Sequence, residues 1–376
     1  MNKKIFAIFL GLIILILAII SLLNKEEVQA PTIDEKIGEM LILGFRGLEV
    51  NDSSKIVQDI NKYNIGGIIV FDYDVPSKTW SRNIESPEQT KKLVSDIKSL
   101  TNENLFIAVD SEGGYVNRLK TRYGFINIES ALKMGEGEAS ETFTQVSQLG
   151  AELKDLGFNL NFAPVVDVNI NPDNPVIGYL ERSFSDDPIK VYEHASSFID
   201  AMHEYNITTA IKHFPGHGSS QDDSHLGLVD ITSTYNKEIE LLPYKELIAS
   251  NKLDMIMTAH VINTNIDSEN PATLSSIFLQ DILRNELGYN GIIVSDDMQM
   301  GAIVDNFGQE EAIIKAINAG CDLLIFSNNN KEYDENIAEK AVNIIKKALE
   351  ENKISEERIN ESYNRIIELK QKYGIL

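Results

Sequence analysis

From about Asp34 onward, short apolar runs alternate with longer stretches in which apolar residues recur at helical spacing. Eight runs are apolar almost throughout, as parallel strands covered on both faces are: Met40–Phe45, Ile65–Phe71, Leu105–Asp110, Asn159–Pro164, Thr208–Phe214, Met255–His260, Gly291–Ser295 and Asp322–Phe326. The amphipathic stretches predict helices over Glu88–Leu100, Glu141–Asp155, Ile189–Glu204, Lys237–Ala249, Ser276–Leu287, Glu310–Ala319, Tyr333–Glu350 and Ser355–Tyr373. Eight strand–helix repeats predict an α/β fold, a (β/α)8 TIM barrel. The alternative is a doubly wound open sheet, but no Gly-x-Gly-x-x-Gly turn follows the first strand.

The first residues of the sequence have the pattern of a targeting segment. Ile5–Leu23 is apolar except for Gly11 and Ser21, and two lysines precede it. About 20 apolar residues are enough to span a membrane, and the lysines favour a cytoplasmic N-terminus. Val28-Gln29-Ala30 also fits a signal-peptidase site. We therefore expect residues 1–30 to be a signal peptide or a membrane anchor and residues 31–376 to be one catalytic domain.

Composition narrows the possible partners. Lys and Arg total 34 against 57 Asp and Glu, which gives a formal net charge of −23. Such a charge repels phosphate backbones, so we expect no nucleic-acid partner. The single cysteine, Cys321, excludes an internal disulfide and a thiolate zinc site.

From the targeting segment we expect an exported protein that is secreted or held at the outer face of the cell membrane. We expect it to be a monomer.

Polar side chains collect where the predicted strands end. Asp110 closes the third strand, Asp167 follows the fourth, and Lys212 and His213 lie in the fifth. Active sites of (β/α)8 barrels lie at the carboxyl ends of the strands, so these groups predict an enzyme. The other members of this set are Glu112, Asn169, His260, Asp296, Asp297, Ser327 and Asn328.

Asp296 and Asp297 follow directly on an apolar run. A carboxylate at a barrel rim can act as a nucleophile, a general base or a metal ligand. Either aspartate could instead cap the helix that follows. Both interpretations remain open from the residues alone.

The long stretch after the fifth strand contains a possible acid/base pair. Asp223 and His225 are two positions apart, so in an extended segment both side chains point the same way. The carboxylate can then orient the imidazole and raise its pKa. For His217 we favour a structural role, and a metal site formed by His213, His217 and His225 is the less favoured alternative.

Several of these motifs resemble the bacterial β-N-acetylglucosaminidases of glycoside hydrolase family 3. The resemblance lies in Lys-His-Phe-Pro-Gly-His-Gly at Lys212–Gly218, in Asp-Ser-His from Asp223 and in Ser-Asp-Asp-Met from Ser295. Further similar segments are Met40–Gly47, Asp110–Gly114, Asn161–Val168 and Ile177–Phe184. The similarity extends from about Ile33 to the C-terminus. One departure is Tyr115, where many relatives carry arginine.

The resemblance implies a retaining β-N-acetylglucosaminidase, with Asp296 as the nucleophile and His225, oriented by Asp223, as the acid/base. It also implies sugar-binding roles for a set of polar residues, namely Asp110, Arg118, Arg182, Lys212 and His213. It implies no cofactor and no metal. The substrate would be an N-acetylglucosamine-containing glycan or a muropeptide derived from peptidoglycan. An export segment would place the enzyme at the cell surface, unlike cytoplasmic relatives.

Three alternatives remain. A neutral histidine does not repel an incoming phosphate, so a β-N-acetylglucosaminide phosphorylase could use the same residues. A β-glucosidase of the same family is the second. A surface glycan-binding protein without turnover is the third, although it would have no use for a nucleophile and an acid/base together.

Overall fold

The computed structural model describes residues 30–101, 104–223 and 227–376. Ile33–Leu376 forms one compact unit around a closed barrel. Eight parallel strands follow one another around the ring and close it, because the first pairs with the last. These strands are β1 (Leu41–Gly44), β2 (Gly67–Ile69), β5 (Phe106–Val109), β8 (Leu160–Asn161), β9 (Thr208–Phe214), β11 (Met255–Thr258), β13 (Ile292–Asp297) and β14 (Leu323–Phe326). The predicted barrel is confirmed, and each predicted strand overlaps an observed one.

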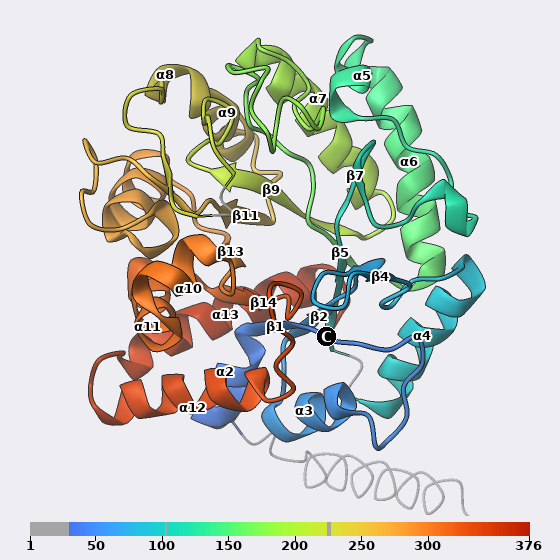
Figure 1. Ribbon diagram of the computed structural model, residues 1–376, viewed down its shortest axis with the longest axis vertical. Coiled ribbons are helices and arrows are strands. Elements are labelled where there is room, and N and C mark those ends of the chain that lie inside the picture. The colour runs from blue at the N-terminus through green and yellow to red at the C-terminus, as the bar shows by residue number, and fades with distance from the viewer. Residues whose placement is uncertain (1–29, 102–103, 224–226) are drawn as a thin grey trace, which may run out of the picture. The chain divides into compact units, whose positions relative to one another are not determined.

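Helices surround the barrel (Figure 1). α6 packs on α7, α7 packs on α9, and α13 packs on α2. The helices are α2 (Ile33–Glu39), α3 (Lys55–Tyr63), α4 (Pro87–Leu100), α5 (Ala131–Gly135), α6 (Ala139–Leu156), α7 (Pro188–His203), α8 (Lys237–Glu240), α9 (Leu242–Ala249), α10 (Gly301–Phe307), α11 (Gln309–Ala319), α12 (Ile337–Glu350) and α13 (Glu356–Lys372). Short 3₁₀ turns lie at Thr121–Tyr123 and Ala272–Leu274, and Ile277–Glu286 is a π-helix.

Local sequence explains where several helices begin. The Ser86 hydroxyl accepts a hydrogen bond from the Gln89 backbone N–H, and Pro87 occupies the first helical position of α4. The Ser355 side chain caps α13 in the same way. A side-chain acceptor satisfies an orphan N–H, and proline at the first position has no N–H to leave unpaired. The helix predicted over Lys237–Ala249 is instead two, because the chain breaks at Leu241.

The amino-terminal end of the barrel holds the last helix through buried carboxylates. Asp322, just before β14, accepts hydrogen bonds from Arg358 and Arg365 of α13. Asp254, just before β11, accepts from Lys372 and Tyr373. These ion pairs fix α13 across the bottom of the barrel, away from the strand ends where polar motifs collect.

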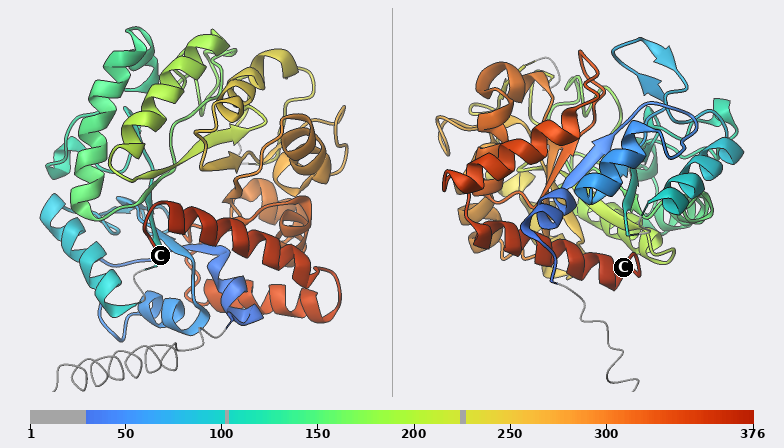
Figure 2. Two further views of the ribbon diagram at one scale, coloured as in Figure 1. Left: turned by 180° about the vertical axis from the view of Figure 1, so that it is seen from behind. Right: turned by 90° about the horizontal axis from the view of Figure 1, so that it is seen from below.

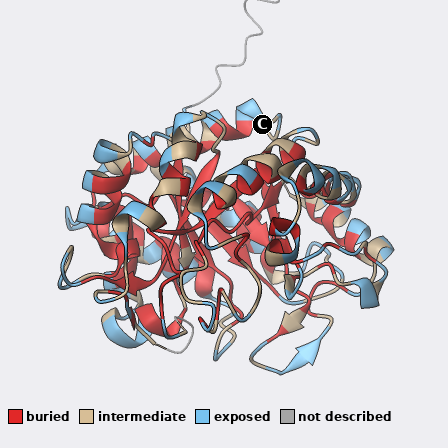
Figure 3. Ribbon diagram, turned by 90° about the horizontal axis from the view of Figure 1, so that it is seen from above, coloured by how far each residue is buried: buried red, intermediate tan, exposed pale blue. Residues whose placement is uncertain are grey.

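The carboxyl ends of the strands carry longer loops and three small sheets. These sheets are the antiparallel hairpins β3 (Tyr73–Asp74)–β4 (Thr79–Trp80) and β6 (Ser111–Gly113)–β7 (Val116–Asn117), and the parallel pair β10 (Val229–Asp230)–β12 (Val261–Ile262). In Figure 2 the β3–β4 hairpin projects on the side away from the C-terminus, and Figure 3 shows its tip as exposed.

The predicted targeting segment lies outside the described residues, apart from Ala30. Within the part of the chain that is described, no helix combines the length and the apolar character needed to cross a membrane. The export and anchoring of the chain therefore stay predictions.

Candidate active site

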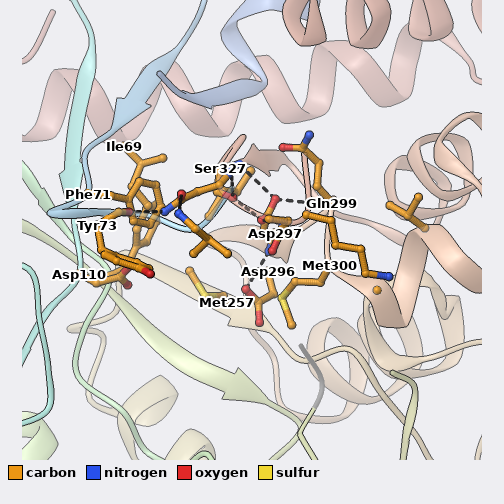
Figure 4. Close-up of a pocket in the computed structure, with 18 of the residues that line it drawn as sticks. Ile69, Phe71, Tyr73, Asp110, Met257, Asp296, Asp297, Gln299, Met300 and Ser327 are labelled. Atoms are coloured by element: carbon orange, nitrogen blue, oxygen red, sulfur yellow. Dashed lines mark hydrogen bonds between the residues drawn. The ribbon is translucent and has the colours of Figure 1, made fainter. Parts of the chain in front are cut away.

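A cavity of about 810 Å³ opens at the carboxyl ends of the barrel strands. Figure 4 shows Asp110 with Ile69, Phe71 and Tyr73 on one side, and Asp296 and Asp297 with Met257 and Met300 across from them. Lining residues come from β2, β9, β11, β13 and β14 and from the loops that follow β2, β5, β8, β13 and β14. The cavity is therefore in the place that the fold predicts for catalysis.

One half of the cavity is a buried cluster of ion pairs. The Lys212 ammonium lies 2.9 Å from Asp110 Oδ1 and 2.7 Å from Glu112 Oε1. The Arg182 guanidinium donates through Nε and Nη2 to the two oxygens of Glu112, at 2.8 Å each. Arg118 Nη2 lies 3.5 Å from Asp110 Oδ2. Asp110 and Glu112 follow β5, Lys212 lies in β9, and only β8 separates these two strands in the ring. Positions about 100 residues apart therefore meet in one cluster.

The ion pairs decide the ionisation of this cluster. Burial alone would raise the pKa of Asp110, but Lys212 and Arg118 hold it below its ordinary value. The pKa of Glu112 is likewise lowered, since Arg182 and Lys212 outweigh the effect of burial. The pKa of Lys212 is raised, because the two carboxylates outweigh the desolvation that would lower it. The half-cavity is therefore fully charged at neutral pH and rich in directed donors and acceptors.

His213 is held by a buried carboxylate. Its Nδ1 lies 2.7 Å from Asp167 Oδ2, and its Nε2 lies 3.1 Å from Arg182 Nη2. Since a carboxylate accepts, Nδ1 carries the hydrogen and Nε2 is left to accept from the guanidinium. Asp167 also accepts from the backbone N–H of His217 at 2.8 Å. The ring of His213 is thus fixed in one orientation at the cavity wall.

All five predicted sugar-binding residues line this one cavity, together with Asp296: Asp110, Arg118, Arg182, Lys212 and His213. Glu112 was on the predicted polar rim without a role, and the structure makes it the partner of both Arg182 and Lys212. Its only sequence signal was its position between Asp110 and two glycines.

Asp296 and Asp297 have different surroundings although they are neighbours on β13. Asp297 is buried and accepts four hydrogen bonds: from the Gln299 and Ser327 backbone N–H groups, the Ser327 hydroxyl and the Asn330 amide. Asp296 is half-buried, lines the cavity and accepts from the Asp297 N–H at 2.7 Å. Neither residue caps α10, whose N-cap is Met300, so the capping interpretation is wrong. Asp297 instead ties β13 to the loop after β14.

Two other predicted residues lie away from the cavity lining. His260 was expected at the rim, but β11 ends at Thr258 and His260 is fully buried. Its Nε2 donates to the Asp297 carbonyl at 3.0 Å, so it supports the backbone beneath the cavity. His217 is also buried, with Nδ1 2.6 Å from the Ser220 hydroxyl, and burial lowers its pKa to about 4. This geometry agrees with the structural role expected for His217.

The predicted acid/base pair is described only in part. Asp223 is half-buried and lies outside the lining residues of the cavity. His225 lies outside the described residues. The dyad therefore stays a prediction. Across the described ranges of the chain, no group of three or more His, Cys, Asp or Glu side chains is placed to hold a metal ion.

A buried arginine joins two loops of the other half of the cavity. Arg82 Nη1 donates to Asp74 and to Asn329, at 2.9 Å each, and Nη2 donates to the Asn328 carbonyl. Asn329 in turn bonds the backbone of Tyr73 and Val75. The β3–β4 hairpin and the loop after β14 thus form one continuous wall.

Comparisons with known proteins agree with this architecture. The family model described as "Glycosyl hydrolase family 3 N terminal domain" matches residues 32–369. A β-hexosaminidase of Tolumonas auensis is 39% identical, over 77% of this chain and 83% of the relative. β-Hexosaminidase A of Pseudoalteromonas piscicida is 33% identical, over 92% of this chain but only 62% of the relative.

Solved structures give the same result. A family-3 β-N-acetylglucosaminidase from Paenibacillus sp. str. FPU-7 superposes with a TM-score of 0.83 at 34% identity, over 92% of this chain and 63% of that one. A β-N-acetylhexosaminidase from Beutenbergia cavernae gives 0.80 at 25% identity, over 91% and 99%. The chain thus spans less than two thirds of some relatives and nearly the whole of others.

Proposed function

Because the chain belongs to glycoside hydrolase family 3, we propose that it is a retaining exo-β-N-acetylglucosaminidase. It removes terminal, non-reducing N-acetyl-β-glucosamine residues by hydrolysis. The observation that carries this proposal is the pairing, in one cavity, of a buried charged cluster with the carboxylate of Asp296. The relatives named β-hexosaminidase or β-N-acetylglucosaminidase support the same substrate class.

The charged cluster binds the terminal sugar. Asp110 and Lys212 present an acceptor and a donor that are held in place by each other, and Arg118 adds donors beside them. Sugar hydroxyls both donate and accept, so such pre-oriented pairs bind them without reorganisation. His213 and Arg182, fixed by Asp167 and Glu112, contact the remaining hydroxyl and acetamido groups.

Asp296 is the nucleophile. It attacks the anomeric carbon, and the bond to the leaving oxygen breaks as a covalent glycosyl-enzyme forms. His225, oriented by Asp223, donates the proton that the leaving oxygen takes up. The same imidazole then accepts a proton from the water that releases the sugar with its β configuration retained. A histidine in this role departs from the pair of carboxylates that most glycosidases use.

The test compares the two neighbouring carboxylates. Asp296→Asn should reduce kcat for a chromogenic N-acetyl-β-glucosaminide by roughly 1,000-fold or more, because it removes the nucleophile. Asp297→Asn should weaken the fold while leaving measurable turnover. Near wild-type turnover by a folded Asp296→Asn enzyme would exclude Asp296 as the nucleophile. Asp223→Asn should shift the basic limb of the pH–rate profile to lower pH, because it removes the negative charge that the proposed dyad places beside the imidazole.

Product analysis separates the alternative activities. The enzyme should release free N-acetylglucosamine in the presence and absence of phosphate, whereas a phosphorylase yields a sugar phosphate. The matching β-glucoside should be hydrolysed poorly, because it lacks the acetamido group.

We propose further that the chain is exported and meets peptidoglycan-derived muropeptides or other N-acetylglucosamine-containing glycans at the cell surface. The apolar run at Ile5–Leu23 supports this localisation. If that segment is uncleaved, the catalytic unit is a membrane-anchored monomer. Fractionation of cells with an antibody against the catalytic unit tests the proposal, and recovery only from the cytosol would contradict it.

A further inference from the structure

Exposed large apolar side chains of the described residues lie toward the carboxyl ends of the barrel strands. Trp80 is 52% exposed, Tyr115 is 64% exposed and Tyr179 is 77% exposed. Val75, Ile189, Ile277 and Val304 are also exposed, and each of the seven lies in a loop, or at the start of a helix, that follows the carboxyl end of a barrel strand. Apart from these and the C-terminal Leu376, the described chain has no large apolar side chain of comparable exposure. Exposed apolar side chains that lie together at a cavity mouth form interaction surfaces, whereas single exposed residues need no explanation.

The three exposed aromatic residues lie on three loops that each contribute residues to the cavity lining. Trp80, Tyr115 and Tyr179 stand on the loops after β2, β5 and β8, which are successive strands in the ring. We refer to Trp80, Tyr115 and Tyr179 as the aromatic arc. In Figure 2 the β3–β4 hairpin that carries Trp80 stands clear of the barrel.

Each residue of the arc is attached to the cavity wall. Trp80 pairs across the β3–β4 hairpin with Tyr73, which lines the cavity. Tyr115 is three residues from Glu112, and Tyr179 is three residues from Arg182. The bidentate Glu112–Arg182 ion pair therefore joins the two loops that carry the tyrosines. The arc is thus a continuation of the wall that holds the terminal sugar.

The arc carries little net charge. The Arg122 guanidinium lies 3.6 Å from the centre of the Trp80 ring, but Arg122 and Lys120 both pair with the buried carboxylate of Asp72. Glu181, next to the Tyr179 loop, accepts a hydrogen bond from Ser130. With the chain as a whole at −23, an anionic polymer is a poor match. Tyrosine and tryptophan, with an apolar ring and a polar edge, suit an uncharged partner that has both C–H and hydroxyl surface.

We propose that the aromatic arc binds successive residues of an uncharged glycan strand of β-linked N-acetylglucosamine. This inference rests on the proposed function and narrows its substrate class. The preferred substrate is a strand of several sugars, whose terminal sugar lies in the cavity and whose following sugars contact the aromatic arc. Ring faces stack on the C–H faces of the sugars, and the phenol hydroxyls and the indole N–H bond their polar groups.

Trp80 is the only tryptophan of the chain, so its fluorescence reports on the arc. The full chain carrying Asp296→Asn is titrated with β-1,4-linked N-acetylglucosamine oligomers of one to six residues. The monosaccharide should leave the emission unchanged, because it fits inside the cavity. Longer oligomers should shift the emission, with a Kd that falls as the strand lengthens.

Adding Tyr115→Ala and Tyr179→Ala to this chain should weaken binding of the hexamer roughly tenfold, through loss of stacking on two rings. In a chain with Asp296 intact, the same two substitutions should leave kcat/KM for the chromogenic monosaccharide substrate unchanged. Tyr363→Ala on α13 is the matched control, since it removes a partly buried tyrosine far along the chain from the three loops.

Three results would overturn the proposal. The first is an emission unchanged by the hexamer while the wild-type chain hydrolyses the chromogenic substrate. The second is equal hexamer affinity with and without the two tyrosines. The third is a dimer that becomes a monomer when the tyrosines are removed, which would make the arc a contact between copies. Failure to hydrolyse any N-acetyl-β-glucosaminide would instead contradict the proposed function.

Discussion

Asp296 and Asp297 show that surroundings, and not residue type, decide what a carboxylate does. Burial raises the pKa of Asp297, the hydrogen bonds from Ser327 and Gln299 lower it, and the neighbouring Asp296 raises it again. Its oxygens are occupied by four donors that bind two loops together. Asp296, the preceding residue of the same strand, lines the cavity. One aspartate therefore builds the site and the other is placed to react.

Glu112 is the residue whose loss tests the charged half of the cavity. Glu112→Gln keeps the size of the side chain but leaves the buried Lys212 and the partly buried Arg182 short of one negative charge. Removing one partner of a buried ion pair costs about 3 kcal/mol of unfolding free energy, measurable by urea denaturation. Losing one charge-assisted hydrogen bond, about 1.5 kcal/mol, should raise KM for the chromogenic substrate roughly tenfold.

The control for this experiment is an exposed glutamate. Glu136 pairs with Lys133 at the surface, where both side chains are more than half exposed. Surface pairs contribute less than about 1 kcal/mol, so Glu136→Gln should change neither stability nor KM measurably. Equal effects of the two substitutions would show that the Glu112 cluster has no special role.

Among the elements, the loop after β9 rests on a buried carboxyl group of α8. Glu240 Oε1 accepts from the Ser219 hydroxyl at 2.6 Å, and the Glu240 side chain packs against Gly216. Burial raises the pKa of Glu240 to about 7, the Ser219 hydrogen bond opposes this, and the charge of Asp167 adds to it. The protonated form of Glu240 is therefore the one that the folded chain prefers.

The sign of the resulting pH dependence follows from this shift. Between the ordinary pKa of 4.5 and about 7, Glu240 keeps its proton in the folded chain and loses it in the unfolded chain. Its contribution to stability is therefore complete below pH 4.5, declines as the pH rises to 7, and is absent above that. The difference amounts to about 3 kcal/mol between pH 4.5 and pH 8.

Glu240→Gln should remove this dependence. The variant should resemble the wild type at pH 4.5 and be more stable than it at pH 8, in guanidinium denaturation at both pH values. Glu238 is an exposed position on the same helix. Glu238→Gln should show the same change of unfolding free energy with pH as the wild type. If the unfolding free energies of Glu240→Gln and the wild type differ by the same amount at both pH values, Glu240 is not the source of the pH dependence.

For the whole molecule, the two ends of the barrel have separate tasks. Buried carboxylates at the amino-terminal end, Asp322 and Asp254, bind α13 and stabilise the fold. Those at the carboxyl-terminal end, Asp110 and Glu112, shape the cavity. We therefore expect a substitution at one end of the barrel to leave the contacts at the other end unchanged, because the packed barrel interior lies between them.

Asp322→Asn tests that division. Asp322 accepts from Arg284, Arg358 and Arg365, so the substitution leaves three guanidinium groups partly uncompensated. We expect a loss of about 3–5 kcal/mol in unfolding free energy. Because the residue lies at the far end of β14 from the cavity, kcat and KM of the folded enzyme should match the wild type at 20 °C. A raised KM in the folded variant would show that the two ends are coupled.

The sequence by itself determined the fold and the region of the site. Each parallel strand is covered on both faces, so it appears as an apolar run, and polar residues that end such runs must collect at one rim. The observed strand Thr208–Phe214 has the bounds expected from its residues alone. The family motifs likewise indicated Asp110, Lys212 and His213, because each of these residues lies within a short recognisable segment.

Only the tertiary structure decided which residues contact one another within that region. Glu112 and Arg182 are 70 positions apart, and Asp297 and Ser327 are 30 apart. The spacing of residues along the chain does not show that Glu112 and Arg182 join two loops. It also does not show that Ser327 bonds Asp297 and not the adjacent Asp296. The exposed arc of Trp80, Tyr115 and Tyr179 is also invisible in the chain order. These features depend on ring closure, which brings distant strand ends together, and local propensity carries no information about that.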